Sequence, residues 1–274
     1  MRLGYNQAET LVNWMVSDYV DFDPQQRDLF GQKFRALHAW HRRDQLPEYV
    51  RLLRETRSRA EDGLSREDVM WVMARGRGRL DAMVQQGADD AAEVLSTLTA
   101  AQVKELDASF IRANRKFMRD WAVGRPAAEQ QRVRAERTIT QVERFTGRLS
   151  REQNERVVAL SNALPLTTDQ RFAERQRRQR ELTAALQSGR SRDELAGWFR
   201  QWAPNWERGR DEAYARTAKI ALEQRTQMYV EIDQMLTPAQ RRVALDRLQG
   251  YIDDFVALIG SDAAQRRAAN QATK

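Results

Sequence analysis

The sequence predicts an all-α fold, an irregular multi-helix bundle of about nine to eleven mostly antiparallel helices. Two features of its composition support this. Among 274 residues only 13 are Gly and 6 are Pro, which leaves few turn-formers for a fold of many strands. The helix-favouring residues Ala, Arg, Leu, Gln and Glu are abundant, and runs of β-branched residues are nearly absent.

A third feature is a five-residue motif consisting of an apolar residue, a helix-capping residue, two variable positions, and then Gln or an acid. The Asp, Ser or Thr at the second position can accept a hydrogen bond from a free backbone N–H, and the last residue can reach back to the cap. Each motif therefore predicts the start of a helix, and the unequal spacing excludes a regular solenoid. The motifs span residues 22–26, 64–68, 98–102, 149–153, 166–170 and 236–240.

Apolar residues between these motifs recur at helical spacing. After the last motif they follow steps of three and four residues, which predicts a helix with one apolar face. A second apolar stripe, over 103–121, contains Asn114, which is either buried and paired or at the edge of a groove. One long helix is predicted over 204–235, and Arg225 interrupts its apolar face.

We expect a single helical domain over residues 1–260, followed by a polar tail over 261–274 that frays. A division into two lobes, 1–125 and 126–260, is an alternative, because the helical pattern breaks at Gly124 and Pro126. No apolar run approaches the roughly 20 residues of a membrane span.

The net charge of +7 and the pI near 10 come mainly from arginine, which makes up 41 of the 46 basic residues. Such a bias is common in GC-rich genomes, and interspersed acids predict solvated helix faces with i,i+4 pairs. The most basic stretch, 171–180, spreads its arginines around a helix and interleaves only Phe172. Nucleic-acid binding by a basic, cytoplasmic helical protein is therefore only a lesser alternative.

Motifs of catalysis are missing from the sequence. There is no cysteine, no glycine-rich phosphate loop after a strand, no paired-histidine metalloprotease motif and no nucleophile elbow. We therefore expect a protein that is not an enzyme and that needs no cofactor, and we name no catalytic or cofactor-binding residue.

The two histidines, His38 and His41, lie three residues apart on one predicted helix. This spacing could supply two nitrogen ligands to zinc, with Asp44 or Glu48 as a third. Because two arginines follow directly, the site is poor for a cation, and we expect ordinary hydrogen-bonding histidines.

Three tryptophans, Trp198, Trp202 and Trp206, recur at steps of four across Pro204. They predict either a core ridge or a partly exposed platform for a partner helix or an unfolded chain. With them we take Arg42, Arg43 and Asn114 as candidates for partner binding.

Several blocks of the chain resemble an uncharacterised family of Gram-negative lipoproteins, catalogued as a domain of unknown function. The blocks are residues 3–6, Trp14, 18–22, 40–47, 112–117 and 143–149. The resemblance implies a periplasmic protein anchored to the outer membrane through a lipidated Cys just upstream. Helix begins almost at the first residue, as expected after removal of a leader.

The capping motifs at 98–102, 166–170 and 236–240 are also similar to the LTxxQ signature of the Spy/CpxP periplasmic chaperones. The chain is about twice the length of those proteins, so two fused repeats would be needed. Neither resemblance carries over functional residues.

Together these features predict a non-catalytic periplasmic lipoprotein body that acts by protein binding. Its partner is either an unfolded client, as for a chaperone, or a defined protein, as for a scaffold of the envelope. Membrane contact is expected only through the lipid anchor, and the sequence does not predict an oligomeric state.

Overall fold

The all-α prediction is confirmed. The computed structural model describes residues 2–272, and the side chains of residues 2–261. No strand occurs among the described residues. In chain order the helices are α1 (Arg2–Asn6), α2 (Ala8–Ser17), α3 (Pro24–Trp40), the π-helix η1 (His41–Gln45), α4 (Leu46–Arg59), α5 (Arg66–Leu95), α6 (Ala100–Trp121), α7 (Ala127–Thr146), α8 (Arg151–Ala163), α9 (Thr168–Gln187), α10 (Arg192–Trp202), α11 (Glu212–Gln234) and α12 (Pro238–Ala272).

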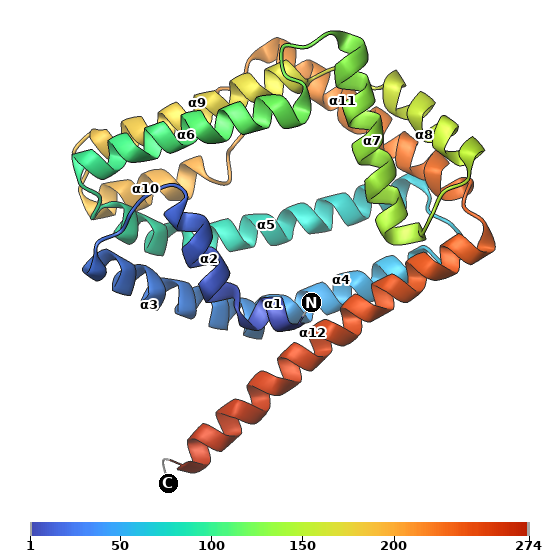
Figure 1. The fold of residues 1–274 in the computed structure, drawn as a ribbon. Coiled ribbons are helices and arrows are strands. Elements are labelled where there is room, and N and C mark those ends of the chain that lie inside the picture. Colours follow the sequence, from blue (N-terminus) through green and yellow to red (C-terminus); the bar gives the residue numbers. More distant parts are fainter. Residues whose placement is uncertain (1, 273–274) are drawn as a thin grey trace.

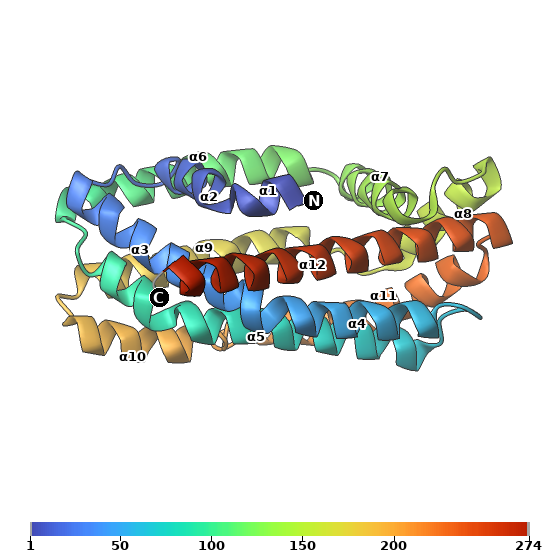
Figure 2. The ribbon, with the colours of Figure 1, turned by 90° about the horizontal axis from the view of Figure 1, so that it is seen from below.

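The helices form a ring around the middle of the molecule (Figure 1). Seen from below, the long helices run roughly along one axis (Figure 2). The two halves of the chain interlock, since α12 packs on α4, α10 on α5 and α9 on α6. The division into lobes stays a prediction.

Buried apolar side chains form separate clusters around this ring. One joins α5, α9 and α10 through Ala92, Ala185 and Phe199. Another joins α7, α8 and α11, with Val157 and Ile232 at its centre. A smaller cluster packs the loop before α3 against the end of α5. These clusters hold neighbouring helices together along the ring.

A helix begins at each of the six predicted starts. Capping boxes begin α3, α5, α6 and α8, and Thr237 caps α12 in the same way, accepting from the backbone N–H of Gln240 at 3.2 Å. The cap predicted at Thr167 is wrong, because its side chain makes no capping hydrogen bond. A further capping box, at Ser191, begins α10. The five-residue motif does not match there because the residue before the cap is Arg190, not an apolar residue.

Four of the capping glutamines also bind each other in pairs, which we call the glutamine clasps. Gln26 and Gln102 each donate their side-chain amide to the other's carbonyl oxygen, at 3.0 and 2.6 Å. Gln153 and Gln240 do the same at 2.8 Å in both directions. Each amide donates in addition to a backbone carbonyl beside the partner motif, those of Thr97, Asp21, Met235 and Arg148. The clasps thus tie the start of α3 to that of α6, and the start of α8 to that of α12.

Replacing Gln26 by alanine is expected to lower the free energy of unfolding by about 1–3 kcal/mol. The side chain is buried, and its loss removes a bond partner from Gln102, from the Thr97 carbonyl and from the backbone N–H of Asp23. Urea unfolding of the single variants and of the double variant with Gln102→Ala should give a coupling of at least about 0.5 kcal/mol. Strictly additive losses would contradict the clasp.

The single helix predicted over 204–235 is wrong at its start. Helix α11 begins only at Glu212, and Asp211 caps it by accepting from the backbone N–H of Tyr214 at 2.9 Å. Gly209 has a φ of +77°, a conformation that favours glycine and ends any helix through it. The resulting loop carries Trp206 and Arg210 to the inner face of the ring.

Helix α12 continues beyond Ser261 to Ala272, so part of the expected tail is helical. The fraying of the tail stays a prediction, and its last two residues, 273–274, lie outside the described residues. None of the helices described is long and apolar enough to cross a membrane.

Candidate functional site

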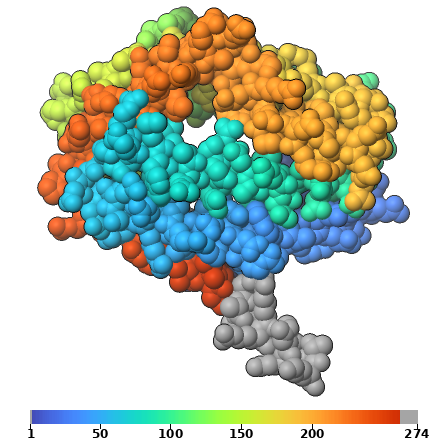
Figure 3. Space-filling view, turned by 180° about the vertical axis from the view of Figure 1, so that it is seen from behind, coloured from blue at the N-terminus to red at the C-terminus, as the bar shows by residue number. Residues whose placement is uncertain are grey.

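A cavity of about 950 Å³ lies in the middle of the ring. Its walls come from α5, α7, α9 and α11, the end of α6, and the loops before α9 and α11. In the space-filling view, the background is visible through an opening between α11 and α5 (Figure 3). The cavity is therefore an opening through the ring and not a closed pocket.

Positive charge dominates the lining of this central cavity. Eight of its side chains are basic and two, Glu207 and Glu223, are acidic. Since acids and bases are nearly balanced in the chain as a whole, this local excess is a property of the cavity. The basic residues are Arg66, Arg77, Arg134, Arg137, Arg171, Arg210, Lys219 and Arg225.

Three of these residues, Arg134 on α7, Arg171 on α9 and Arg225 on α11, we call the arginine cluster. Among the described residues no carboxylate lies within 4.0 Å of their guanidinium groups. Burial lowers the pKa of Arg134, and the charge of Arg225 lowers it further. Burial also lowers the pKa of Arg171, with smaller contributions from Arg225 and Arg137. Within the described part of the chain, the cluster therefore brings like charges together with no carboxylate beside them.

Arg134 is held in place by the backbone. Its Nη1 and Nη2 donate to the carbonyl oxygens of Pro165 and Leu164 at 2.8 and 3.0 Å, and its buried Nε has no partner in the described part of the chain. Carbonyl oxygens orient a guanidinium without cancelling its charge, so Arg134 keeps its attraction for an anion.

Aromatic rings lie against the other arginines of the cavity. Trp121 is within cation–π distance of Arg137 and Arg171, at 4.1 and 4.8 Å from its ring centre. Trp206 holds the same relation to Arg77 and Arg210, at 4.9 and 4.8 Å. The rings fix these cations by attraction to their faces. Arg77 and Arg210 also form ion pairs, with Asp81 at 3.0 Å and with Glu207 at 3.4 Å.

Apolar side chains complete the walls. Met70 on α5 and Leu222 on α11 are 52% and 48% exposed although they line the cavity. Met73 and Tyr229 lie beside them in the lining. Methionine is flexible and adapts to apolar groups of different shapes, so these walls suit a ligand with both charged and apolar parts.

The predicted tryptophan candidates divide between the core and the cavity. Trp198 and Trp202 are stacked with ring centres 4.7 Å apart, and both pack on the buried cluster around Phe199. The indole Nε1 of Trp202 donates to Glu181 at 2.8 Å. These two form the core ridge that was one of the two interpretations, while Trp206 lines the cavity.

The other partner-binding candidates contact neighbours within the chain. Asn114 is buried on α6, donates to Gln179 on α9 at 2.7 Å and accepts from Arg175 at 2.8 Å. It fixes the register of these two helices. Arg42 donates to Asn6 at 2.6 Å, and Arg43 pairs with Asp44 at 2.6 Å.

His38 and His41 lie where α3 passes into η1, against the first helix. The hydroxyl of Tyr5 is 2.8 Å from Nδ1 of His41, and the Tyr5 ring is 4.5 Å from that of His38. Glu48, one of the proposed third zinc ligands, is engaged by Arg51 and Arg79. The described residues contain no group of three side chains that could hold a metal.

Acidification is expected to weaken this contact. Burial, aided by the charge of Arg42, lowers the pKa of His38 below 6.5, and burial with His38 lowers that of His41. The unfolded chain then binds protons more strongly than the folded one, so stability is full above about pH 6.5 and falls as the pH drops through the lowered values. Thermal unfolding at about pH 7.5 and 5 should show a smaller loss in a His38→Gln/His41→Gln variant. An equal loss of thermal stability in the variant and in the unaltered protein would contradict the role of the two histidines in this pH dependence.

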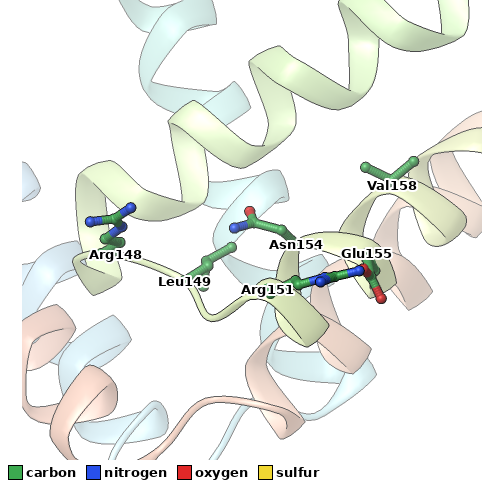
Figure 4. A pocket seen from close by; sticks show the side chains of 6 residues that line it. All are labelled: Arg148, Leu149, Arg151, Asn154, Glu155 and Val158. Carbon is green, nitrogen blue, oxygen red and sulfur yellow. The ribbon is translucent and has the colours of Figure 1, made fainter.

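A second depression, of about 510 Å³, lies at the turn between α7 and α8. Figure 4 shows Arg151 and Glu155 side by side at its edge, and they form an ion pair of 2.9 Å. Leu149 and Val158 provide apolar surface. Besides this pair the depression is lined by a single further charge, Arg148, whereas the central cavity gathers eight basic side chains, so the central cavity is the stronger candidate.

Sequence reasoning found the cavity residues only in part. The sequence shows that Arg225 interrupts an apolar helix face, and Arg225 does line the cavity. Arg171 belongs to the basic stretch that we interpreted as a solvated surface, and nothing in the sequence distinguished Arg134. Their convergence depends on three helices that meet only in the folded ring.

These features define an all-helical protein built around a cationic cavity. The chain belongs to a family of unknown function, DUF6279, whose profile matches residues 18–208. The expected membership of an uncharacterised family is confirmed. The matched span includes Arg134 and Arg171 and ends before Arg210, Tyr214 and Arg225. No curated protein and no solved structure matches the chain.

Proposed function

We propose that this chain is a non-catalytic binding protein of the bacterial envelope, and that its central cavity receives a partner polypeptide. The observation that carries the proposal is the opening through the ring, whose walls combine half-exposed apolar side chains with arginines. A chain can enter on one side and leave on the other, whereas a small substrate is usually enclosed.

The kinds of side chain in the cavity support binding over catalysis. Arginines, tryptophans and methionines are groups that hold a partner by charge and contact area. Of the two acids in the lining, Glu207 pairs with Arg210 at 3.4 Å. The envelope location, and the lipid anchor that would hold the protein at the outer membrane, rest on the resemblance to Gram-negative lipoproteins.

Blocking the opening tests the proposal. Ala218 lies on the cavity wall of α11, and tryptophan at this position should fill part of the opening. Ala215 is exposed on the same helix and is absent from the lining, so Ala215→Trp is the matched control. At several-fold excess the unaltered protein and the control should suppress aggregation of a reduced, unfolded model protein, and Ala218→Trp should be several-fold weaker.

Positions 218 and 215 also serve to distinguish a chaperone from a scaffold protein. If the unaltered protein does not suppress aggregation, the chaperone branch fails. A photo-crosslinking residue at 218 should then give one discrete product with an envelope protein, and none at 215. Equal activity of Ala218→Trp and the control, together with no selective crosslink at 218, would overturn the cavity as the binding surface. Circular dichroism melting of all variants verifies their folding.

A further inference from the structure

We propose that the occupant of the central cavity is an extended, acidic stretch of polypeptide, in which carboxylate side chains alternate with apolar ones. This inference rests on the proposed function and adds the chemistry of the partner. Its basis is the meeting, in one opening through the ring, of half-exposed apolar side chains and an arginine cluster that pairs with no carboxylate of the described residues.

Charge complementarity indicates that the ligand carries negative charge. Elsewhere in the chain arginines find carboxylates readily, for example Arg132 with Glu136 at 2.7 Å and Arg156 with Glu231 at 2.5 Å. The arginine cluster has no such pair in the described residues, although three helices contribute to it. Keeping like charges together costs free energy, and an anionic ligand would recover it.

The geometry of the donors favours carboxylates. A guanidinium group presents its N–H bonds in a planar fork that matches the two oxygens of a carboxylate. Arg134 is oriented by two backbone carbonyls, and Arg137 donates to the carbonyl oxygen of Asp120 at 2.7 Å. These anchors hold the cationic groups in place before a ligand arrives, which lowers the entropy cost of binding.

The apolar walls of the cavity indicate the second component of the ligand, its apolar side chains. Met70 and Leu222 lie on α5 and α11, neighbouring helices that contact each other and border the opening. Successive side chains of an extended peptide point to opposite sides, about 3.3 Å apart along the chain. Carboxylates can thus face α7 and α9, while apolar side chains contact the methionines.

Three peptides of about ten residues test the inference by fluorescence anisotropy. They share the same apolar residues, and the alternate positions carry Glu, Gln or Lys. The Glu peptide should bind at least about tenfold more tightly than the Gln peptide, the Lys peptide should bind most weakly, and added salt should reduce the difference.

Variants identify the cluster as the source of this preference. Arg134→Gln/Arg225→Gln should bind the Glu and Gln peptides with nearly equal affinity. Arg132→Gln/Arg151→Gln removes the same charge from exposed positions outside the cavity lining and should retain the preference for Glu.

Three other outcomes would each contradict one part of the proposal. Equal binding of the Glu and Gln peptides would remove the acidic preference and leave the proposed function standing. If none of the peptides binds and Ala218→Trp has no effect on aggregation or crosslinking, both fail. If dodecyl phosphate displaces a bound reporter from the cavity and the Glu peptide does not, the site takes a small anionic amphiphile, and the polypeptide is the wrong ligand.

Discussion

Replacing Asp233 by alanine is expected to lower the free energy of unfolding by about 3–5 kcal/mol, because it breaks a largely buried ion pair and leaves one charge without its partner. The carboxylate of Asp233, near the end of α11, accepts two hydrogen bonds from Arg241 on α12, both at 3.0 Å. It also accepts from the backbone N–H of Leu64, before α5, at 2.8 Å. One side chain thus joins the turn between α11 and α12 to the segment before α5, which lies 169 residues away in the sequence.

The expected loss follows from what would remain after the substitution. The side chain of Arg241 is 20% exposed, and it would keep only its donations to the backbone carbonyls of Ala60 and Asp233. The N–H of Leu64 would lose its acceptor. Denaturant unfolding followed by circular dichroism measures the loss.

An exposed pair provides the control for this substitution. Glu155→Ala removes the partner of Arg151, whose side chain is 86% exposed, and should change stability by less than about 0.5 kcal/mol. Equal effects of the two substitutions would show that the contact at Asp233 contributes no more than a surface ion pair.

Replacing Arg225 by methionine is expected to change stability and binding in opposite directions. No hydrogen bond or ion pair of Arg225 is present within the described structure, and it adds positive charge to the surroundings of Arg134 and Arg171. Its removal should raise the free energy of unfolding by about 1 kcal/mol, since repulsion among like charges falls.

The same substitution should weaken binding of an acidic peptide at least about tenfold and reduce its dependence on salt. Melting curves and anisotropy titrations on the same samples measure both effects. Arg216→Met removes an exposed charge that is paired with Glu212 on the same helix and should leave affinity unchanged. A variant of Arg225 that is both less stable and equally tight in binding would contradict a binding role for the cluster.

The sequence predicted the fold class well because helix starts are encoded locally. A cap such as Ser65 and its partner Asp68 are three residues apart, so both can be recognised from the sequence alone. The prediction was wrong at Thr167, where the motif is present and the side chain is buried without capping. Thr167 has a ψ of 10°, whereas the residues that cap α3, α5, α6 and α8 are extended, with ψ between 159° and 170°, so its hydroxyl is not placed over the helix start.

The site was harder to predict because its distinguishing property is an absence of partners in space. A solvated arginine and one in the arginine cluster look alike in the sequence when acids are interspersed with bases throughout. Only the placement of α7, α9 and α11 around one opening shows which arginines lack carboxylates. The exception, Arg225, could be recognised because it interrupts an apolar periodicity.

The two glutamine clasps have a topological consequence. The first lies within residues 23–102 and the second within 150–240, and in each a pair of capping glutamines ties two helix starts together. Each pair therefore closes the chain between its two helix starts into a non-covalent loop. The arginine cluster comes from α7, α9 and α11. Because α9 and α11 both lie between the starts of α8 and α12, the second clasp closes the stretch of chain that carries Arg171 and Arg225.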